Sequence, residues 1–579
     1  MGFLKKYFIR YRKNIFLGQA FKLVEAVLEL YMPLVMAALI DQGVTGHDQT
    51  VIWQKGLLML GIAALGVCAA LVCQVTASRA SQDFGTALRH DLFAHILSLS
   101  RAEGDGVGPA ALMTRMTSDI NQLQQALAML IRLVVRAPFL AIGSIVMAVV
   151  LSPRLSLIFL VTTPLIALAM FFIMRRTLPH YKTLQRKLDR IARITRENLE
   201  GVRVVRAFAR GDAEKARFEA AGEDYTDTAV RVGKLSALLS PLTSAVMYMG
   251  IAAVLYFGGG QVHTGALTQG VVIAFISYLM QILLQMSVVA NLVVVFTKAG
   301  ASAQRVGELM ALAPSVQEPS GDETPDPAAP AVQFDHVTFS YPGGGDAALR
   351  DVTFTLLPGE TLGVIGGTGA GKTTLSALIG RDYDVTAGTV SVCGHDVRAY
   401  RQRTLRGLIG LTPQGGQLLS GTVRSNLLFS KPDASEADMW AALEAAQARE
   451  FVEKKPEGLD APVEEGGKNL SGGQRQRLTV ARALVRAPRV LILDDASSAL
   501  DYMTDLKMRQ AIARQDRETG RATVIISQRV SAVRHADRIL VLDDGCQAGL
   551  GTHGELTESC PVYREICQSQ QVEKEAAQA

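Results

Sequence analysis

The residues best suited to chemistry lie in one glycine-rich stretch of the second half of the chain. Residues 366–374 read GGTGAGKTT and match G-x-x-x-x-G-K-[ST], a pattern whose glycines let the backbone wrap around phosphates. An apolar run at 361–365 precedes it and indicates a buried strand, and the run at 375–379 indicates a helix. The N-terminus of that helix would offer free N–H groups and a positive dipole end to anions. We therefore expect Lys372 to reach the outer phosphates of a nucleotide and the Thr373 hydroxyl to bind Mg²⁺.

Further motifs follow in an order that fits one nucleotide site. The apolar run 490–493 ends at Asp494, the place for a second Mg²⁺ anchor, and Gln414 closes the sequence LTPQ. Tyr341 lies upstream, where it could stack on an adenine. Residues 470–477 read LSGGQRQR, and Asp501 closes the sequence SALD.

The first half of the chain predicts a membrane domain. The chain has 579 residues, of which 49% are hydrophobic and only 20% charged, a composition that favours a membrane part. A helix needs about 20 apolar residues to cross a bilayer. Six runs meet this length, at about 14–41, 56–78, 128–151, 155–174, 236–258 and 270–297.

Loop charges orient these spans. The segments after the second and fourth spans are rich in Arg and Lys. The connections at 42–54, 152–154 and 258–269 together contain a single Arg or Lys, which is Arg154. The positive-inside rule therefore places both termini and the two long basic segments in the cytoplasm. The basic and aromatic residues 1–13 suggest a short interfacial helix. No stripe of basic residues with interleaved aromatics indicates nucleic-acid binding.

Several polar side chains lie within the predicted spans. Lys22, Glu25 and Glu29 share one helical face of the first span, and charges in lipid must face a cavity or a partner. Glu25 and Glu29 could contact substrate, or a Lys–Glu pair could tie helices together. Gln281 and Gln285 of the sixth span could line a pathway, although hydrogen bonds between helices explain them equally well. Arg132 and Arg136 lie nearer the cytoplasmic end, which favours side chains that snorkel to the membrane surface or a structural role.

The domain organisation follows from a change of pattern near residue 313. Residues 1–312 predict an all-α transmembrane domain of six helices, and the proline-rich residues 313–331 predict a linker. From 332 the chain alternates strand and helix patterns, with an alternating strand at 332–339 and buried runs at 361–365, 490–493, 523–526 and 539–542. Residues 332–570 therefore predict an α/β P-loop NTPase domain, and 571–579 a disordered tail.

The motif set of the second half, with LSGGQ as its most specific member, resembles the nucleotide-binding domain of an ATP-binding-cassette (ABC) transporter. Six spans with long cytoplasmic extensions resemble the exporter type, and the sequences MTRMTSD at 113–119 and RENLEGVRVVRAF at 196–208 resemble its multidrug-type branch. The resemblance implies an integral protein of the bacterial cytoplasmic membrane, made of two half-transporters. ATP and Mg²⁺ would lie between the P-loop of one half and the LSGGQ of the other, and hydrolysis would drive a hydrophobic or amphipathic compound outward.

The resemblance assigns roles to individual residues. The ATP-binding residues would be Tyr341, Gly366, Gly367, Thr368, Gly369, Ala370, Gly371, Lys372, Thr373, Thr374 and Gln414. The Mg²⁺ ligands would be Thr373, Gln414 and Asp494. The signature residues Leu470, Ser471, Gly472, Gly473 and Gln474 would act on the partner's ATP, beside the D-loop residue Asp501.

Two positions depart from the family at the place where hydrolysis occurs. After Asp494 the family has a Glu that acts as general base, and this chain has Asp495 at that position. Further along the chain the family has a switch His, and this chain has Gln528 there. Asp is shorter than Glu by one methylene, about 1.5 Å of reach, and an amide cannot carry a proton. The chain therefore resembles the subunit of a heterodimeric exporter whose own ATP site hydrolyses slowly. A slow homodimer, a transporter of peptides, lipids or siderophores, and a nucleotide-gated regulatory subunit remain alternatives. Glu464, where the family has Gly, has no physical explanation from the sequence.

Overall fold

The computed structural model describes residues 2–578, with side chains for residues 2–570. The chain forms two compact units. The first comprises Met1–Leu97 and Ala110–Ala311, and the second comprises Ser98–Pro109 and Leu312–Ala579. The two units divide at Leu312, and the short segment Ser98–Pro109 belongs with the second unit, although it lies between two predicted spans.

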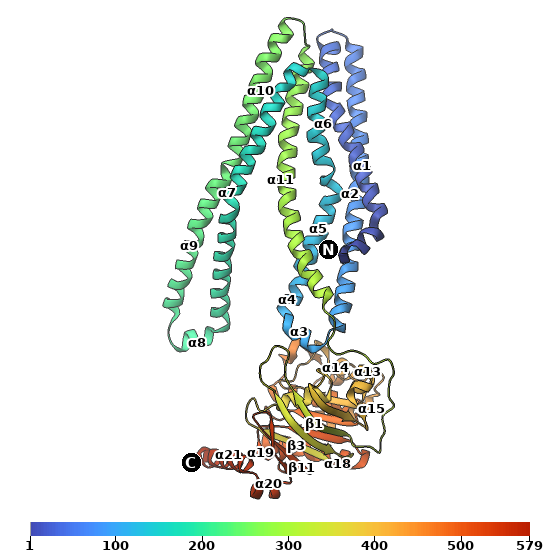
Figure 1. Cartoon of the computed structure of the whole chain (residues 1–579), viewed down its shortest axis with the longest axis vertical. Helices are drawn as coiled ribbons and strands as arrows, with labels where there is room; N and C mark the ends of the chain where they lie inside the picture. The colour runs from blue at the N-terminus through green and yellow to red at the C-terminus, as the bar shows by residue number, and fades with distance from the viewer. Residues whose placement is uncertain (1, 579) are drawn as a thin grey trace. The chain divides into compact units, whose positions relative to one another are not determined.

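The first unit is helical throughout its long elements (Figure 1). Six helical runs in the described residues are long and apolar enough to cross a membrane: Gly2–Val44, Gln49–Ser98, Pro109–Leu151, Pro153–Glu200, Gly211–His263 and Gln269–Ala311. They are built from η1 (Gly2–Leu4), α1 (Lys5–Ala38), η2 (Leu39–Val44), α2 (Gln49–Ser98), α4 (Pro109–Thr114), η3 (Arg115–Asp119), α5 (Ile120–Met129), η4 (Leu130–Val134), α6 (Arg136–Leu151), α7 (Pro153–Glu200), α9 (Gly211–Ala237), α10 (Leu239–His263) and α11 (Gln269–Ala311). The short helix α8 (Val202–Ala207) lies between the fourth run and the fifth.

These helices are longer than a membrane requires. The 50 residues of α2 extend about 75 Å at 1.5 Å per residue, against a hydrocarbon core of about 30 Å. The basic segments after the second and fourth predicted spans are therefore continuations of α2 and α7. The predicted interfacial helix at 1–13 is not a separate element, because α1 runs unbroken from Lys5. Its N-terminal turns are held to α2 by Tyr7, whose hydroxyl donates to the Asp91 carboxylate at 2.6 Å.

The second unit is built on a ten-stranded sheet of order β5-β4-β1-β2-β12-β11-β3-β10-β9-β6. Strands β3, β10, β9, β6 and β11 run parallel, and β1 pairs antiparallel with β2 and β4. The bounds are β1 (Val332–Phe339), β2 (Leu349–Leu356), β3 (Thr361–Gly366), β4 (Ala387–Val392), β5 (His395–Asp396), β6 (Ile409–Thr412), β9 (Val490–Asp494), β10 (Ala522–Ile526), β11 (Arg538–Asp543) and β12 (Cys546–Gly551), with β7 (Gly421–Thr422) and β8 (Pro462–Val463) in a separate pair. All five strands predicted from the sequence are present.

Helices accompany the sheet. Their bounds are α3 (Arg101–Val107), α12 (Lys372–Ile379), α13 (Gln402–Leu408), α14 (Val423–Leu428), α15 (Glu436–Ala445), α16 (Arg449–Glu453), α17 (Gly472–Leu484), α18 (Tyr502–Thr519), α19 (Val530–Val533), α20 (His553–Ser559) and α21 (Pro561–Gln578), with short turns η5 (Val397–Ala399), η6 (Gly458–Asp460) and η7 (Glu465–Gly467). The α21 backbone continues to Gln578 through the segment 571–579 for which the sequence predicts a disordered tail, and Ala579 lies outside the described residues.

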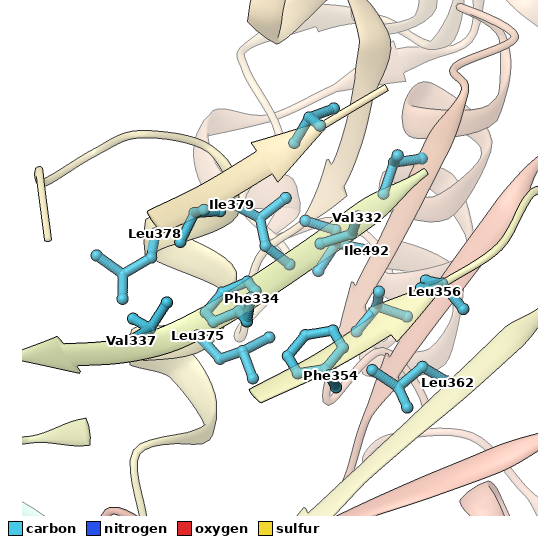
Figure 2. Packing of buried hydrophobic residues seen from close by; sticks show 14 of the residues in the cluster. Val332, Phe334, Val337, Phe354, Leu356, Leu362, Leu375, Leu378, Ile379 and Ile492 are labelled. Atoms are coloured by element: carbon cyan, nitrogen blue, oxygen red, sulfur yellow. The ribbon is translucent and has the colours of Figure 1, made fainter. Parts of the chain in front are cut away.

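The core of the second unit fixes the helix that follows the P-loop. Phe334 of β1 and Phe354 of β2 stack with centroids 4.6 Å apart, and Leu375 and Leu378 of α12 belong to the same buried cluster (Figure 2). The first of these leucines, Leu375, is 0% exposed. Because α12 is anchored by its apolar face, its N-terminus at Lys372 has a fixed position relative to the sheet.

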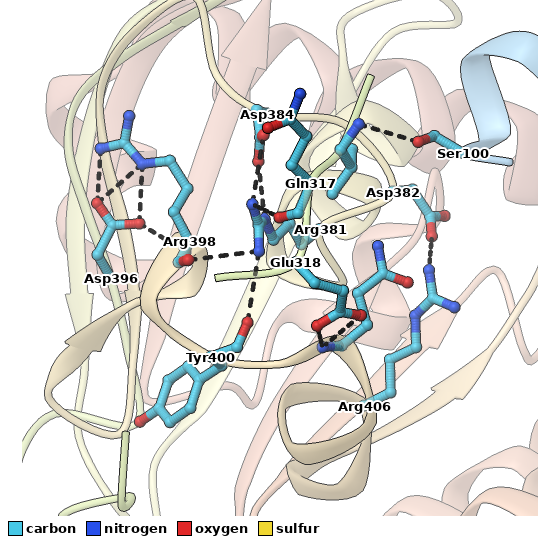
Figure 3. Close-up of polar contacts among 12 residues, drawn as sticks. Ser100, Gln317, Glu318, Arg381, Asp382, Asp384, Asp396, Arg398, Tyr400 and Arg406 are labelled. Carbon is cyan, nitrogen blue, oxygen red and sulfur yellow. Dashed lines mark hydrogen bonds and ion pairs between the residues drawn. The ribbon is translucent and has the colours of Figure 1, made fainter. Parts of the chain in front are cut away.

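The predicted linker at 313–331 has no regular structure, yet it is held to the second unit by hydrogen bonds. The Arg381 guanidinium donates to the Gln317 carbonyl oxygen at 3.0 Å and to Asp384 at 2.8 Å (Figure 3). The Glu318 carboxylate accepts from the Gln402 backbone N–H at 3.2 Å. Hydrogen bonds from residues among the prolines therefore hold this segment against the second unit.

Candidate ATP site

The parallel part of the sheet brings the predicted motifs together. Strands β3, β9, β10 and β6 are neighbours and parallel, so that their carboxyl ends lie at one edge. The P-loop follows β3, Asp494 ends β9, Gln528 lies two residues after β10, and Gln414 lies two residues after β6. Motifs separated by more than a hundred residues thus converge because each follows a strand of the same sheet.

Two glycines of the P-loop are required by its geometry. Gly371 has a φ of +93°, and a Cβ there would lie 2.7 Å from the Ala348 carbonyl oxygen. A Cβ on Gly366 would lie 2.2 Å from the Leu542 carbonyl oxygen. Side chains at these positions would displace the loop from the strands that support it, so only glycine keeps the N-terminus of α12 open to phosphate.

Lys372 and the acidic residues of β9 form a coupled set of charges. Burial lowers the pKa of the Lys372 ammonium, and Asp494 and Asp495 oppose that shift. Burial raises the pKa of the Asp494 carboxyl, while hydrogen bonds from Ser376 and Thr373 act in the opposite direction. The Lys372 ammonium donates to the carbonyl oxygens of Gly366 and Gly367 at 2.8 and 2.6 Å. It must leave these carbonyls to reach a phosphate.

A cavity of about 380 Å³ lies at this edge of the sheet. Tyr341 lies at its rim, where its hydroxyl is 2.9 Å from the Thr374 hydroxyl and its ring makes edge contacts with Phe339 and Tyr383. An aromatic face held in this way suits a nucleotide base. The complete lining is Tyr341, Ala348, Thr368, Gly369, Gly371, Lys372, Thr373, Thr374, Gln414, Asp494, Asp495, Ile526, Ser527 and Gln528.

The oxygen donors that line this cavity fit Mg²⁺. Thr373, Gln414 and Asp494, whose side chains each carry an oxygen, all line this one cavity. Mg²⁺ takes hard oxygen ligands, commonly one or two carboxylates together with the phosphates of its nucleotide. When bound there, the ion would neutralise charge between the outer phosphates. The residues predicted for this role are therefore suitably placed.

Asp495 and Gln528, the two positions that depart from the family pattern, face the same cavity. The Asp495 backbone is left-handed, with a φ of +49°, and its N–H donates to the Ile526 carbonyl oxygen at 2.9 Å. Burial raises the pKa of the Asp495 carboxyl, whereas Arg529 and hydrogen bonds with Ser498 and Gln414 lower it. The short carboxylate is thus held by neighbours on the cavity wall.

The signature residues begin a helix at a different place. The cavity lining, as far as the described residues define it, includes none of residues 470–474. Ser471 caps α17, its hydroxyl accepting from the Gln474 N–H at 3.2 Å while the Gln474 side chain accepts from the Ser471 N–H at 3.1 Å. Asp501 caps α18 in the same manner, accepting from the Thr504 N–H at 2.9 Å. The N-terminus of α17, with Gly472 and Gly473, therefore lies outside the lining of the cavity at this chain's own P-loop.

Sequence comparison identifies the family. The family description "ABC transporter transmembrane region" matches residues 15–287, and "ABC transporter" matches residues 349–498. An uncharacterized ABC transporter ATP-binding protein of Mycobacterium tuberculosis, Rv1273c, is 37% identical over 98% of both chains. The chain belongs to the ABC transporter family. It is an ATP-driven exporter half with membrane and nucleotide-binding domains in one polypeptide, and exporters of this fold work as dimers in a membrane.

Two relatives whose names state a function have lower sequence identity. The ATP-dependent lipid A-core flippase of Chromobacterium violaceum is 30% identical over 97% of this chain and 95% of its own. The multidrug efflux ATP-binding/permease protein Rv0194 of M. tuberculosis is 32% identical over 97% of this chain and 47% of its own. A solved bacterial Atm1-family ABC exporter with ATP bound has the same fold, with a TM-score of 0.77, 23% identity and 98% coverage of both chains.

The charged residues of the first span lie in a paired cluster. Within α1, the Lys22 ammonium is 2.7 Å from the Glu25 carboxylate. Arg136 of α6 reaches both acids, at 2.6 Å from Glu29 and 3.9 Å from Glu25. Arg132 donates to the Ser78 hydroxyl at 2.8 Å. The tie between helices therefore comes from Arg136, while Lys22 and Glu25 share one helix. Glu29, with 34% of its side chain exposed, is the more accessible of the two acids.

The glutamines of the sixth predicted span lie in different environments. The Gln281 side chain accepts a hydrogen bond from the Ser144 hydroxyl of α6 at 3.0 Å. Gln285 is 0% exposed, and neither polar atom of its amide has a hydrogen-bond partner among the described residues. In this conformation Gln281 contributes to helix packing and Gln285 is enclosed, so a role in the substrate pathway would require the spans to move.

Two further contacts were not anticipated from the sequence, and the backbone accounts for one departure from the family pattern. Asp119, in the MTRMTSD sequence, is buried and pairs with Arg305 of α11. Gln476, just beyond the signature, contacts the segment that follows Asp494. Glu464 has ordinary extended backbone angles, φ −74° and ψ 165°, which explains why a residue other than Gly fits there. The signal that the sequence offered for the first contact was the position of Asp119 at the end of the MTRMTSD sequence.

Proposed function

We propose that this chain is one subunit of a heterodimeric ABC exporter in which the ATP site on its own P-loop hydrolyses slowly. The observation that supports it most strongly is the shared location of Asp495 and Gln528. Both residues face one cavity, and both lack a property that ATP hydrolysis uses there: the reach of a Glu carboxylate and the proton-carrying capacity of a His. Loss of a positioned base costs about 10²–10⁴-fold in rate.

The remaining ATP machinery of the chain is intact, which argues for retained binding. Lys372, Thr373 and Asp494 line the cavity together with the P-loop glycines Gly369 and Gly371. The signature helix is capped and its glycines are accessible, so that α17 can complete a second site on the partner's P-loop. We infer that this chain clamps ATP on its own side and supplies LSGGQ to a partner with its own Glu and His.

For the cargo, we propose hydrophobic or amphipathic compounds moved out of the cytoplasm, with both termini on the cytoplasmic side of the inner membrane. The names of two relatives, one a lipid A-core flippase and one a multidrug efflux protein, favour cargo with apolar parts. Peptide, lipid or siderophore transport would use the same ATP-driven cycle with a different cavity. A nucleotide-gated regulatory subunit would keep the clamp without contributing turnover.

Purification of the full-length chain alone, in lipid nanodiscs, tests the subunit assignment. We expect steady-state ATPase activity to be at least about 100-fold lower than that of the same chain co-purified with its partner half-transporter, because a homodimer would contain only slow sites. The control is a matched preparation with Lys372→Ala, which sets the background. ATPase activity of the lone chain equal to that of the pair would contradict the heterodimer. Transport by the co-expressed pair, screened against dyes, lipids and peptides, then identifies the cargo.

A further inference from the structure

Gln476 joins the signature helix to the turn that carries Asp495. It lies in the second turn of α17 and is 6% exposed. Its amide nitrogen donates to the Asp495 carbonyl oxygen and to the Ser498 hydroxyl, both at 2.9 Å. Its amide oxygen accepts from the Ala499 N–H, also at 2.9 Å. All three hydrogen bonds therefore go to the segment 495–499, which leads into the D-loop residue Asp501.

The turn at Asp495 requires such support. A residue with a side chain avoids the left-handed conformation, so the surroundings must impose the φ of +49° at Asp495. The Asp495 carbonyl oxygen accepts from Gln476 and, at 3.3 Å, from the Ser498 N–H. On the other side of the turn the Asp495 N–H is bound to β10. Removal of the Gln476 amide would leave this carbonyl with only the weaker contacts of its own turn.

We propose that Gln476 is a positioning residue that couples the signature helix to the catalytic carboxylate position of the same chain. One end of α17 presents Gly472 and Gly473 to a phosphate, and its next turn holds the backbone that orients Asp495 in the other ATP site. A displacement of α17 by nucleotide at one site is thereby passed to the other. Only a primary amide provides both donors and the acceptor. The coupling operates in a homodimer as well as in a heterodimer, so it stands apart from the subunit assignment.

Hydrogen–deuterium exchange of the full-length chain in nanodiscs tests this coupling. The probe is MgADP, which occupies the P-loop but lacks the terminal phosphate that a signature helix contacts. In the wild type, MgADP should protect residues 469–478 as well as the P-loop. In Gln476→Met, the loss of three hydrogen bonds should raise exchange over 494–501 at least about tenfold. MgADP affinity should stay within about threefold, because Gln476 does not line the cavity.

The chain offers a matched control in Asn426 of α14. This amide is 2% exposed, donates to the carbonyl oxygens of Leu419 and Thr422, and accepts from the Leu419 N–H. Asn426→Leu removes the same number of hydrogen bonds from an equally buried amide. It should raise exchange near residues 418–426 and leave the effect of MgADP on 469–478 intact. If Gln476→Met does not fold, Gln476→Glu replaces it, with Asn426→Asp as its control.

The result that supports the coupling is loss of MgADP-induced protection over 469–478 in the Gln476 variant alone, at nearly unchanged MgADP affinity. A purely structural role would lower the melting temperature and leave that protection in place. The proposal is overturned if the protection persists in Gln476→Met, if exchange over 494–501 does not change, or if MgADP fails to protect 469–478 in the wild type.

Discussion

Lys372 and Gly472 should have unequal importance if this chain's P-loop and signature serve different ATP sites. Lys372→Ala removes the cation from the site that we propose to be slow. Gly472→Asp places a carboxylate against the phosphate bound by the partner, at the site that turns over. In the complex of both half-transporters, we therefore expect Lys372→Ala to retain a measurable fraction of ATPase activity and Gly472→Asp to abolish it.

The contacts of Lys372 in the structure set the expected loss of ATP affinity in Lys372→Ala. A hydrogen bond to a charged group contributes about 1.5–3 kcal/mol, which is about 10- to 150-fold in ATP affinity. The lower part of this range is expected, because the Lys372 ammonium gives up contacts with two carbonyl oxygens at 2.8 and 2.6 Å when it turns to phosphate. At millimolar ATP such a loss still permits partial occupancy, so the domains can close and the other site can turn over.

The structure also separates the second effect from misfolding. A Cβ on Gly472 would meet only Ala499, at an ordinary distance of 3.4 Å. A carboxylate in the first turn of α17 also favours the helix dipole. Gly472→Asp should therefore fold, and its inactivity should come from repulsion of phosphate. Gly472→Asn, of the same size without the charge, is the matched control and should lose less activity.

The assay is steady-state ATPase of each variant, co-purified with the wild-type partner, over a range of ATP concentrations. Equal loss in Lys372→Ala and Gly472→Asp would refute the assignment of the two motifs to different sites. Full activity in Gly472→Asp would show that this signature does not complete the hydrolytic site.

Three further predictions concern topology and folding. Reporters fused after residues 48 and 263 should lie outside the cytoplasm and one after residue 210 inside; a cytoplasmic reporter at 263 would contradict the six spans. Gly371→Ala should lower the stability of the second unit by about 2–5 kcal/mol, because its Cβ meets the Ala348 carbonyl at a positive φ, whereas Gly367→Ala, with open space around it, should not shift the thermal transition. Arg521→Met should cost about 3–5 kcal/mol by leaving Asp516 buried without its partner at 2.5 Å, and an unchanged melting temperature would show that the pair is dispensable.

Local patterns account for most of the architecture that could be predicted. The alternating pattern at 332–339 predicts β1, and the short apolar runs predict β3, β9, β10 and β11. These strands could be predicted because a strand buried in a sheet consists largely of apolar residues. The spans were predicted for the same reason. The length of α2 and α7 was less apparent, since the basic residues that end a hydrophobic run do not end a helix that continues into water.

Contacts between distant segments were beyond the sequence. Most residues that line the ATP cavity sit in the predicted motifs, whereas Ala348, Ile526 and Ser527 do not. The hydrogen bonds of Gln476 depend on how α17 lies against the β9 edge. In the membrane unit, the sequence suggested a Lys–Glu pair that ties helices together, but Lys22 and Glu25 pair within α1. The role of Arg136 as their partner from α6 required the tertiary structure. The proline-rich segment 313–331 predicts a linker, but its sequence gives no periodic signal of the polar contacts that bind it to the second unit.

The most direct test of the slow site is to identify the nucleotide on each chain during turnover. Photoreactive ATP trapped with the assembled pair should remain ATP on this chain and become ADP on the partner. In the double variant Asp495→Glu, Gln528→His, this chain should also hold ADP, whereas neither single change should suffice, because base and switch act together. ADP on the wild-type chain, formed at the rate of the partner's site, would contradict the account.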